Sequence, residues 1–282
     1  MTRYPIYIIS KGRPKCITAK ALDLMMVDYE IVIEPQDLKS YMDYYDRKKI
    51  RILPFRDLGQ GSIPARNWVW EDSIKRGFSR HWILDDNIEQ FNRLNNNLQI
   101  KVHCPAPFQA AEDFVDRYKN VGLAGFEYDF FCKSRCNWPP FRLNTRIYSC
   151  ILIRNDLPFR WRGRFNEDTD LSLRVLKSGE CTVLFLAFLQ QKTQTMKMQG
   201  GNTEMYKETD SRREFAESLM QQHPDVAKVT RKFGRWHHHV NYKPFKKNNL
   251  EFIDSIELSD SNNEYGMSLC DSNNKKNHKS LK

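Results

Sequence analysis

The chain has 282 residues, of which 45 are Lys or Arg and 35 are Asp or Glu, giving a formal net charge of +10. With 40% hydrophobic and 28% charged residues, the composition is typical of globular proteins and argues against a fibrous or disordered chain. No stretch approaches the ~20 apolar residues of a membrane span. The first residues lack the apolar region of a signal peptide. The seven scattered Cys indicate reduced thiols, so we expect a cytoplasmic protein.

The positive charge belongs to the main body of the chain and not to its last residues. Residues 254–282 hold five acidic side chains and four Lys, a net charge of −1, which leaves +11 for the remainder. A surplus of this size favours a polyanionic partner, because Lys and Arg steer anions and release counterions. A basic surface that only maintains solubility is the alternative.

The first 90 residues predict alternating strands and helices. Short apolar runs predict the strands and helical spacing of apolar residues predicts the helices. The predicted strands are 4–9, 29–33, 49–54 and 81–84, and the predicted helices are 17–26, 38–46 and 65–76. Repeats of this length imply an α/β fold with a parallel, doubly wound sheet. Ligands bind at the carboxyl ends of such strands, where Ser10, Glu34 and Asp85 lie.

The second half mixes its elements less regularly. It predicts helices at 111–119, 168–178 and 211–222, and strands at 121–126, 148–154 and 181–188. A polar loop holds Gly200-Gly201, and residues 255–282 are rich in Ser, Asn and Lys, which predicts a flexible tail. We therefore expect one domain over residues 1–250, followed by the tail.

Two adjacent carboxylates, Asp85 and Asp86, follow the predicted strand at 81–84 and precede Asn87. Because like charges repel and neither side chain packs in a core, the pair favours a divalent cation. Such a cation takes carboxylate oxygens and bridges them to substrate phosphates. A solvated turn after an edge strand is the alternative.

The residues around this pair resemble a known enzyme class. In chain order the motifs are Gly61-Ser62-Ile63-Pro64, Ala65-Arg66-Asn67, Gly77 and Asp85-Asp86. This order is similar to the nucleotide-sugar-binding half of GT-A glycosyltransferases of the family 2 type. The resemblance implies a Rossmann-like, mostly parallel sheet with helices on both faces. It places Arg66 near the donor diphosphate, and Asp85 and Asp86 on the ribose and the metal, Mn²⁺ or Mg²⁺. Asp85-Asp86-Asn87 stands where these enzymes have Asp-x-Asp, so Asn87 replaces the last carboxylate. Which of the two neighbouring positions binds the metal therefore stays open.

A second acidic group, Glu167, Asp168 and Asp170, lies at the start of a predicted helix. The helix dipole favours carboxylates there, so capping is one interpretation. The pattern Glu-Asp-x-Asp-Leu-x-x-Arg, about 80 residues after the Asp pair, is also similar to the Glu-Asp motif of the same enzymes. That similarity implies that Asp168 is the general base for the acceptor hydroxyl, with Glu167 contacting the acceptor or the sugar.

Taken along the whole chain, the motifs resemble the TET-associated glycosyltransferases, mostly phage enzymes that attach sugars to hydroxymethylated pyrimidines in DNA. The ordered set is Ile9-Ser10-Lys11-Gly12-Arg13-Pro14, Val32-Ile33-Glu34-Pro35, Arg66-Asn67, Leu84-Asp85-Asp86, Glu167-Asp168 and Gly200-Gly201. The resemblance spans roughly residues 4–245. It implies a nucleotide pocket formed by Ser10, Lys11 and Arg13, with Glu34 on the base or ribose. A loop with Lys and Arg at the end of a strand suits a diphosphate, since both donate charge-assisted hydrogen bonds.

Three consecutive His, 237 to 239, lie in an aromatic setting. On a strand, His237 and His239 share a face and would complete a metal shell with Asp86. Enzymes of the GT-A class often take a late His ligand. A surface strand whose His pack or contact phosphates is the alternative.

Basic and aromatic residues alternate on the approach to Glu167. The proposed acceptor contacts are Arg142, Arg162, Arg164, Trp138 and Trp161. Arg neutralises phosphates and aromatic rings stack on an extruded base, whereas salt bridges to the acidic helix start are the alternative.

Together these features predict a metal-dependent GT-A glycosyltransferase, with residues 1–100 as the nucleotide-sugar-binding half and 101–250 as the acceptor half. It would move a sugar from a UDP-sugar to 5-hydroxymethylcytosine in DNA, in an infected bacterial cytoplasm if phage-encoded. The alternatives are a glycan or another hydroxylated base as acceptor, or a catalytically silent nucleic-acid-binding protein on this scaffold.

Overall fold

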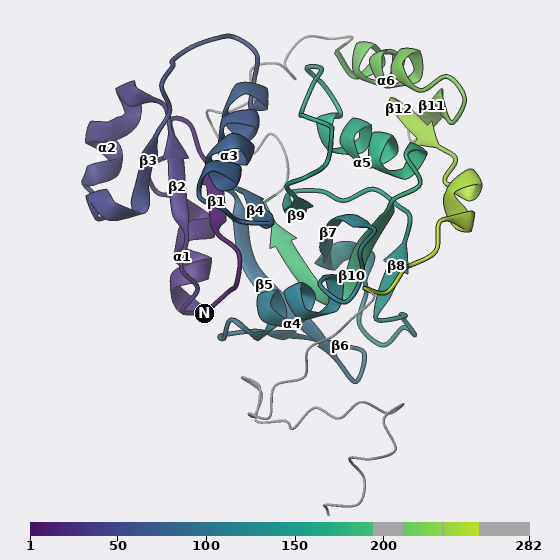
Figure 1. Ribbon diagram of the computed structural model, residues 1–282, viewed down its shortest axis with the longest axis horizontal. Coiled ribbons are helices and arrows are strands. Elements are labelled where there is room, and N and C mark those ends of the chain that lie inside the picture. Colours follow the sequence, from purple (N-terminus) through teal and green to yellow (C-terminus); the bar gives the residue numbers. More distant parts are fainter. Residues whose placement is uncertain (194–210, 233, 254–282) are drawn as a thin grey trace, which may run out of the picture.

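The computed structural model describes residues 1–193, 211–232 and 234–253 (Figure 1). A ten-stranded sheet forms its centre, in the order β3-β2-β1-β4-β9-β7-β10-β5-β6, with β8 paired to β10. Seven of these strands share one direction, whereas β5, β8 and β9 run against them. The expected α/β class with a mostly parallel sheet is confirmed.

The elements have the following bounds. The strands are β1 (Ile6–Ile9), β2 (Glu30–Ile33), β3 (Ile50–Ile52), β4 (Arg80–Asp85), β5 (Ile88–Asn95), β6 (Leu98–Lys101), β7 (Val121–Tyr128), β8 (Phe141–Leu143), β9 (Cys150–Arg154), β10 (Cys181–Lys192), β11 (Ala227–Lys232) and β12 (Arg235–Val240). The α-helices are α1 (Ile17–Leu24), α2 (Leu38–Met42), α3 (Ile63–Lys75), α4 (Ala106–Val115), α5 (Glu167–Lys177) and α6 (Ser211–Gln222).

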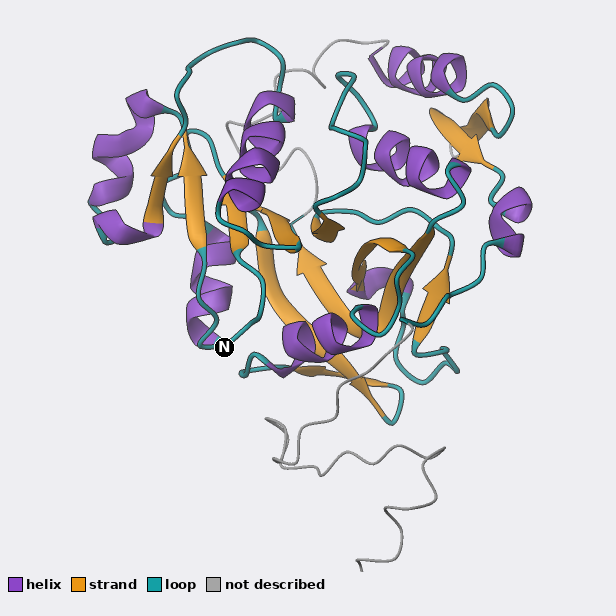
Figure 2. Cartoon of the chain, in the orientation of Figure 1, coloured by secondary structure: helices purple, strands orange, loops and turns teal. Residues whose placement is uncertain are grey.

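Helices cover both faces of the sheet because successive strand side chains point to opposite sides (Figure 2). In β4, Trp82 and Leu84 join the apolar cluster that includes α1 and α4, whereas Ile83 joins the cluster that includes α3 and α5. The same alternation holds in β1. Each fully buried side chain of this kind contributes about 1.5–3 kcal/mol. A third apolar cluster packs α6, β11 and the 3-10 turn at Lys243–Lys247 on the outer side of α5.

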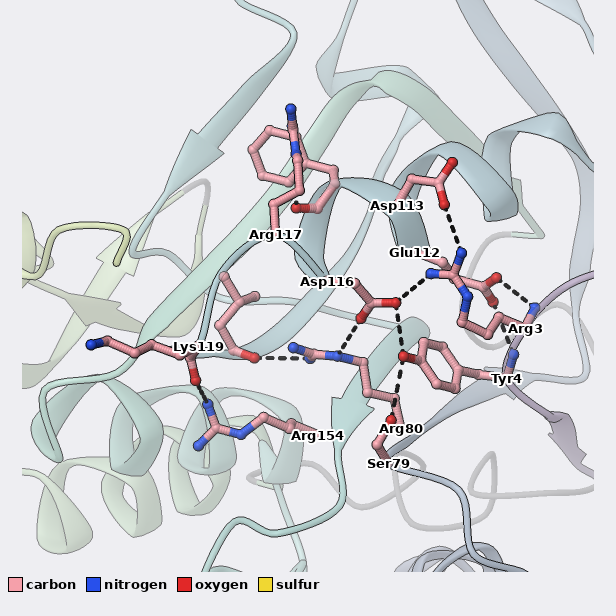
Figure 3. Close-up of polar contacts among 12 residues, drawn as sticks. Arg3, Tyr4, Ser79, Arg80, Glu112, Asp113, Asp116, Arg117, Lys119 and Arg154 are labelled. Carbon is pink, nitrogen blue, oxygen red and sulfur yellow. Dashed lines mark hydrogen bonds and ion pairs between the residues drawn. The ribbon is translucent and has the colours of Figure 1, made fainter. Parts of the chain in front are cut away.

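Polar contacts hold the amino-terminal end of β4 (Figure 3). Arg80 is buried at the first position of the strand and donates to Asp116 Oδ1 at 3.1 Å and to the carbonyl of Val121 at 2.9 Å. The hydroxyl of Tyr4 donates to Asp116 Oδ2 at 2.8 Å. These contacts tie the first residue of β4 to the end of α4 and to β7. They thereby help to fix the strand whose last residue is Asp85.

The predicted strands and helices of residues 4–84 are confirmed, with ends that differ by a few residues. The helix predicted at 111–119 is misplaced: α4 begins at Ala106, because Pro105 and Pro107 suit a helix start. The hairpin of β5 and β6 was not predicted. Its turn is Asn96-Asn97, both with positive φ, which is the geometry of a tight hairpin turn. The predicted loop at Gly200-Gly201 and the predicted tail lie outside the described residues.

Candidate active site

The candidate active site forms where the carboxyl ends of β1 and β4 meet the first turns of α3 and α5. Ile9 pairs with Asp85 in register, so Ser10 and Asp86 follow from neighbouring strands. Arg66 lies in the first turn of α3 and Asp168 in the first turn of α5. Residues that are far apart in the chain therefore meet at one edge of the sheet, as the sequence predicts for parallel strands.

Arg66 lies at the centre of this site and is almost fully buried. Its Nη1 donates to Asp168 Oδ1 at 2.8 Å and its Nη2 donates to Asp85 Oδ1 at 3.1 Å. The guanidinium carbon also lies 4.5 Å from the centre of the Trp161 ring. Burial alone would lower the pKa of Arg66, but the attraction of the carboxylates raises it. One permanent cation thus fixes the relative positions of Asp85 and Asp168.

Lys192, at the end of β10, is the main residue that sequence reasoning missed. Its Nζ donates to Asp85 Oδ2 at 2.6 Å and to Ser149 Oγ at 2.8 Å. The Ser149 hydroxyl also bonds the hydroxyl of Tyr128 at 2.7 Å. Burial alone would lower the pKa of Lys192, but Asp85 raises it, so the ammonium stays charged. We call Arg66, Asp85, Asp168 and Lys192 the charge cluster.

The carboxylates of the charge cluster have opposite pKa shifts. Burial alone would raise the pKa of Asp85, but Lys192 and Arg66 lower it to about 2. For Asp168, burial raises the pKa to about 7, against the pull of Arg66 and with repulsion from Glu167 and Asp85 adding to the rise. Two carboxylates whose environments separate their pKa values in this way are typical of a permanent anion beside a proton acceptor.

Asp86 faces different neighbours from Asp85. Its Oδ1 accepts from Arg13 Nη1 at 2.9 Å and its Oδ2 accepts from Ser10 Oγ at 2.9 Å. Ser10 Oγ also lies 2.6 Å from the hydroxyl of Tyr41. Burial raises the pKa of Asp86 despite the nearby Arg13. Ser10 and Arg13 from the predicted nucleotide loop are therefore placed beside Asp86.

A second polar group lies further out along the same edge. Lys11 Nζ is 2.9 Å from the carboxylate of Glu34 and 2.8 Å from Asp57 Oδ1. The Lys11 side chain is 48% exposed, so the group is open to a ligand. The structure thus brings Lys11 and Glu34 together, whereas Asp57 was not predicted.

Some predicted site residues are engaged inside the protein. Asn67 exchanges hydrogen bonds of 2.9 and 2.8 Å with the backbone of Trp161, so it clamps that segment. Trp161 is only 2% exposed and cannot stack on an extruded base in this conformation. Arg162 is 3.0 Å from Asp170 Oδ1, but its side chain is 51% exposed. The predicted acceptor residues that lie nearer the surface are Trp138, Arg142, Arg162 and Arg164.

The predicted metal ligands do not gather at one point. His237 and His239 are exposed on β12, which pairs with β11 in a separate two-stranded sheet. Among the described residues, no group of three or more His, Cys, Asp or Glu side chains could hold a metal ion. Each carboxylate oxygen of Asp85 and Asp86 also accepts from a cation or a hydroxyl. A divalent cation needs several oxygens around one centre, so these residues as placed do not fit one.

Asp170 also lies in the first turn of α5, but its contacts differ from those of Asp168. It is 1% exposed and pairs with Arg162, Arg174 and His223. Burial alone would raise its pKa, but these partners lower the pKa of Asp170 to about 2. The acidic start of α5 therefore combines a candidate reactive carboxylate with a carboxylate that holds the fold together.

We expect Asp170→Asn to lower the free energy of unfolding by about 3–5 kcal/mol, because it leaves the largely buried Arg174 without its counter-charge. The matched control is Asp225→Asn, whose exposed pair with Lys177 contributes only about 0–1 kcal/mol. Urea unfolding followed by circular dichroism measures both. Equal, small effects of the two variants would contradict a structural role for Asp170.

Comparisons with known proteins give one structural similarity and one family match. A solved structure from Desulfovibrio desulfuricans G20, provisionally described as a nucleotide-diphospho-sugar transferase, is 12% identical, with a TM-score of 0.42 over 79% of this chain and 98% of that chain. No curated protein matches the chain. The family model described as TET-Associated Glycosyltransferase matches residues 4–201, well over half of the sequence. The chain therefore belongs to the TET-associated glycosyltransferase family and is a glycosyltransferase.

Proposed function

We propose that this glycosyltransferase moves a sugar from a UDP-sugar to the hydroxymethyl group of 5-hydroxymethylcytosine in DNA. Membership of the family supports the reaction class. The observation that carries the proposal is the position of Asp168, a carboxylate of raised pKa that Arg66 holds at 2.8 Å beside the cations on Asp85. This places a proton acceptor next to positive charge, which is what transfer of a sugar from a diphosphate requires.

In the proposed step, Asp168 accepts the proton of the acceptor hydroxyl as its oxygen attacks the anomeric carbon of the sugar. The bond from that carbon to the diphosphate breaks, and its electron pair leaves with the diphosphate oxygen. Arg66 then has two roles: it keeps Asp168 in place, and it neutralises the charge that develops on the leaving group. Glu167, partly buried at the start of α5, is the neighbouring contact for the acceptor or the sugar.

The donor nucleotide fits the groups that follow β1 and β2. Lys11 and Arg13 supply positive charge for phosphates, and Glu34 supplies a carboxylate for a ribose hydroxyl or the base. All three follow parallel strands at the edge where ligands bind in doubly wound sheets. The divalent cation expected from the sequence is not part of the proposed mechanism, because the described side chains do not fit one.

The acceptor side is supported by an aromatic row that sequence reasoning missed: Tyr128, Phe130, Phe131 and Tyr148. The rings of Tyr128 and Phe130 are stacked, with centres 5.3 Å apart, and Phe130 is 57% exposed. Arg146 lies over Phe131 and Tyr148 at 5.8 and 5.1 Å. The row begins at Tyr128, which bonds Ser149 beside Lys192. Exposed rings with an interleaved Arg suit stacking on a base and contact with its phosphates.

Trp138 and Arg142 form a second aromatic–cation pair, with the Arg142 guanidinium 5.4 Å from the Trp138 ring centre. Together with Arg164, they keep their proposed role as acceptor contacts. The excess positive charge of the chain supports the same choice of a polyanionic acceptor.

The direct test is to incubate the protein and a panel of UDP-sugars with DNA containing 5-hydroxymethylcytosine, with Mg²⁺ and Mn²⁺ present. Digested nucleosides are then analysed by mass spectrometry. We expect the modified nucleoside to gain one sugar, and DNA with ordinary cytosine to gain none. Asp168→Asn should slow transfer by about 10²–10⁴-fold, since it removes the proton acceptor. The control Asp156→Asn changes an exposed carboxylate and should leave transfer unchanged.

Transfer only to a glycan or to another hydroxylated base would replace the proposed acceptor. DNA binding with no sugar transfer from any donor would support the silent-scaffold alternative. Full activity of Asp168→Asn would overturn the assignment of the base.

For the acceptor surface, we expect Phe130→Ala to lower kcat/KM for DNA by about tenfold, because stacking on one aromatic ring is worth about 1–3 kcal/mol per base. Hydrolysis of the UDP-sugar without DNA should stay unchanged, because the substitution leaves the charge cluster intact. Phe252→Ala, which removes an exposed ring that lies tilted against Tyr118 with ring centres 4.9 Å apart, is the matched control. Equal losses for DNA use and donor hydrolysis would place Phe130 outside the acceptor surface.

A further inference from the structure

The second cation on Asp85 is an ammonium from β10, which lies three strands away from β4 in the sheet. Lys192 is the last residue of β10, and the register of β10 against β5 shifts between Gln191 and Lys192. Such an irregularity re-aims a side chain. The strand thereby delivers Lys192 Nζ to within 2.6 Å of Asp85 Oδ2, on the side of Asp85 opposite to Arg66.

The two members of the carboxylate pair do not converge. Consecutive residues at the end of an extended strand point to opposite sides. Asp85 accordingly contacts Arg66 and Lys192, whereas Asp86 contacts Ser10 and Arg13. A cation bridging the pair would need both carboxylates to turn toward one centre and to release all four donors. Both carboxylate oxygens of Asp85 are already paired with side-chain cations.

The position of Lys192 is also open to a ligand. Its side chain is 18% exposed and that of Asp85 is 24% exposed, whereas Arg66 beneath them is 5% exposed. An anion that approaches the charge cluster from solvent would therefore reach the partly exposed Lys192 first, with the buried Arg66 behind it. Two fixed positive charges, one on each carboxylate oxygen of Asp85, carry the same formal charge as a divalent cation. Lys and Arg are established alternatives to Mg²⁺ for stabilising a phosphate that leaves.

We propose that Lys192, with Arg66, neutralises the leaving diphosphate in this protein, so that sugar transfer does not need a divalent cation. This inference rests on the proposed function, because it concerns the same donor and the same bond. As the anomeric carbon–oxygen bond breaks, the electron pair moves to the diphosphate oxygen, and Lys192 Nζ and Arg66 share that charge. Asp85 holds the two cations in place before the donor arrives, which makes it a positioning residue.

The test compares metal-stripped and metal-supplemented protein. The protein is dialysed against EDTA, its residual metal is measured by mass spectrometry, and UDP binding is measured by calorimetry with and without Mn²⁺. Transfer rates are measured on the same samples. We expect UDP binding and transfer in EDTA to stay within about twofold of the values with Mn²⁺. Loss of both in EDTA, with recovery on adding Mn²⁺ or Mg²⁺, would overturn the inference while leaving the proposed function standing.

Variants of Lys192 separate its chemistry from its contribution to folding. Lys192→Met should lower kcat by about a hundredfold, the loss typical for removing one charge-stabilising donor, and should weaken UDP binding. Lys192→Arg should recover part of both, because it restores the charge. Lys20→Met removes an exposed charge on α1 and should change neither. Thermal melting establishes whether each variant is folded.

The readouts also separate the two proposals. If no UDP-sugar is turned over on any acceptor, the proposed function fails, and the dependence of UDP binding on metal and on Lys192 still decides the inference. If Lys192→Met binds UDP and transfers sugar like the unchanged protein, the inference fails.

Discussion

A buried guanidinium between two carboxylates is the constraint on which the rest of the site depends. A charge without a partner costs several kcal/mol in a protein interior, so Arg66 is stable only with counter-charges in contact. Asp85 and Asp168 supply them from the end of β4 and the start of α5. Strand β4 and helix α5, which carries the candidate base, are thus held together by one side chain. Lys192 adds a second tie from β10.

This arrangement gives neighbouring acidic residues different chemical properties. Asp85, between two cations, remains an anion, and Asp168 has a pKa shifted toward neutrality by burial and by repulsion from Glu167 and Asp85. Asp170, two positions further along α5, is buried among Arg and His partners and has a depressed pKa. Asp168 and Asp170 both lie at the start of α5, so their position on the helix does not explain their different pKa values. The difference comes from the side chains that the tertiary structure places around each of them.

The sequence predicted the parts of the site that depend on local pattern. Alternating strands and helices place the residues after β1, β2 and β4 at one edge, and the structure brings Lys11 to Glu34 and Ser10 to Asp86 there. It did not predict Lys192, because the predicted strand ended at residue 188 and the apolar run at Leu189, whereas β10 continues through two polar Gln to Lys192. It also proposed Trp161 and Arg162 as acceptor contacts. Composition cannot reveal that the Trp161 ring is buried, or that the half-exposed Arg162 pairs with the buried Asp170.

The most direct test of the central claim, that Asp168 in the charge cluster is the base, is the pH dependence of kcat/KM for sugar transfer. Only the ionised carboxylate accepts a proton, and burial, the largest influence on this group, raises the pKa of Asp168 to about 7. We expect kcat/KM to rise with pH through a single ionisation near neutrality, while DNA binding over the same range changes less. A rate that is flat from pH 5 to pH 8, or that falls as the pH rises, would contradict this assignment.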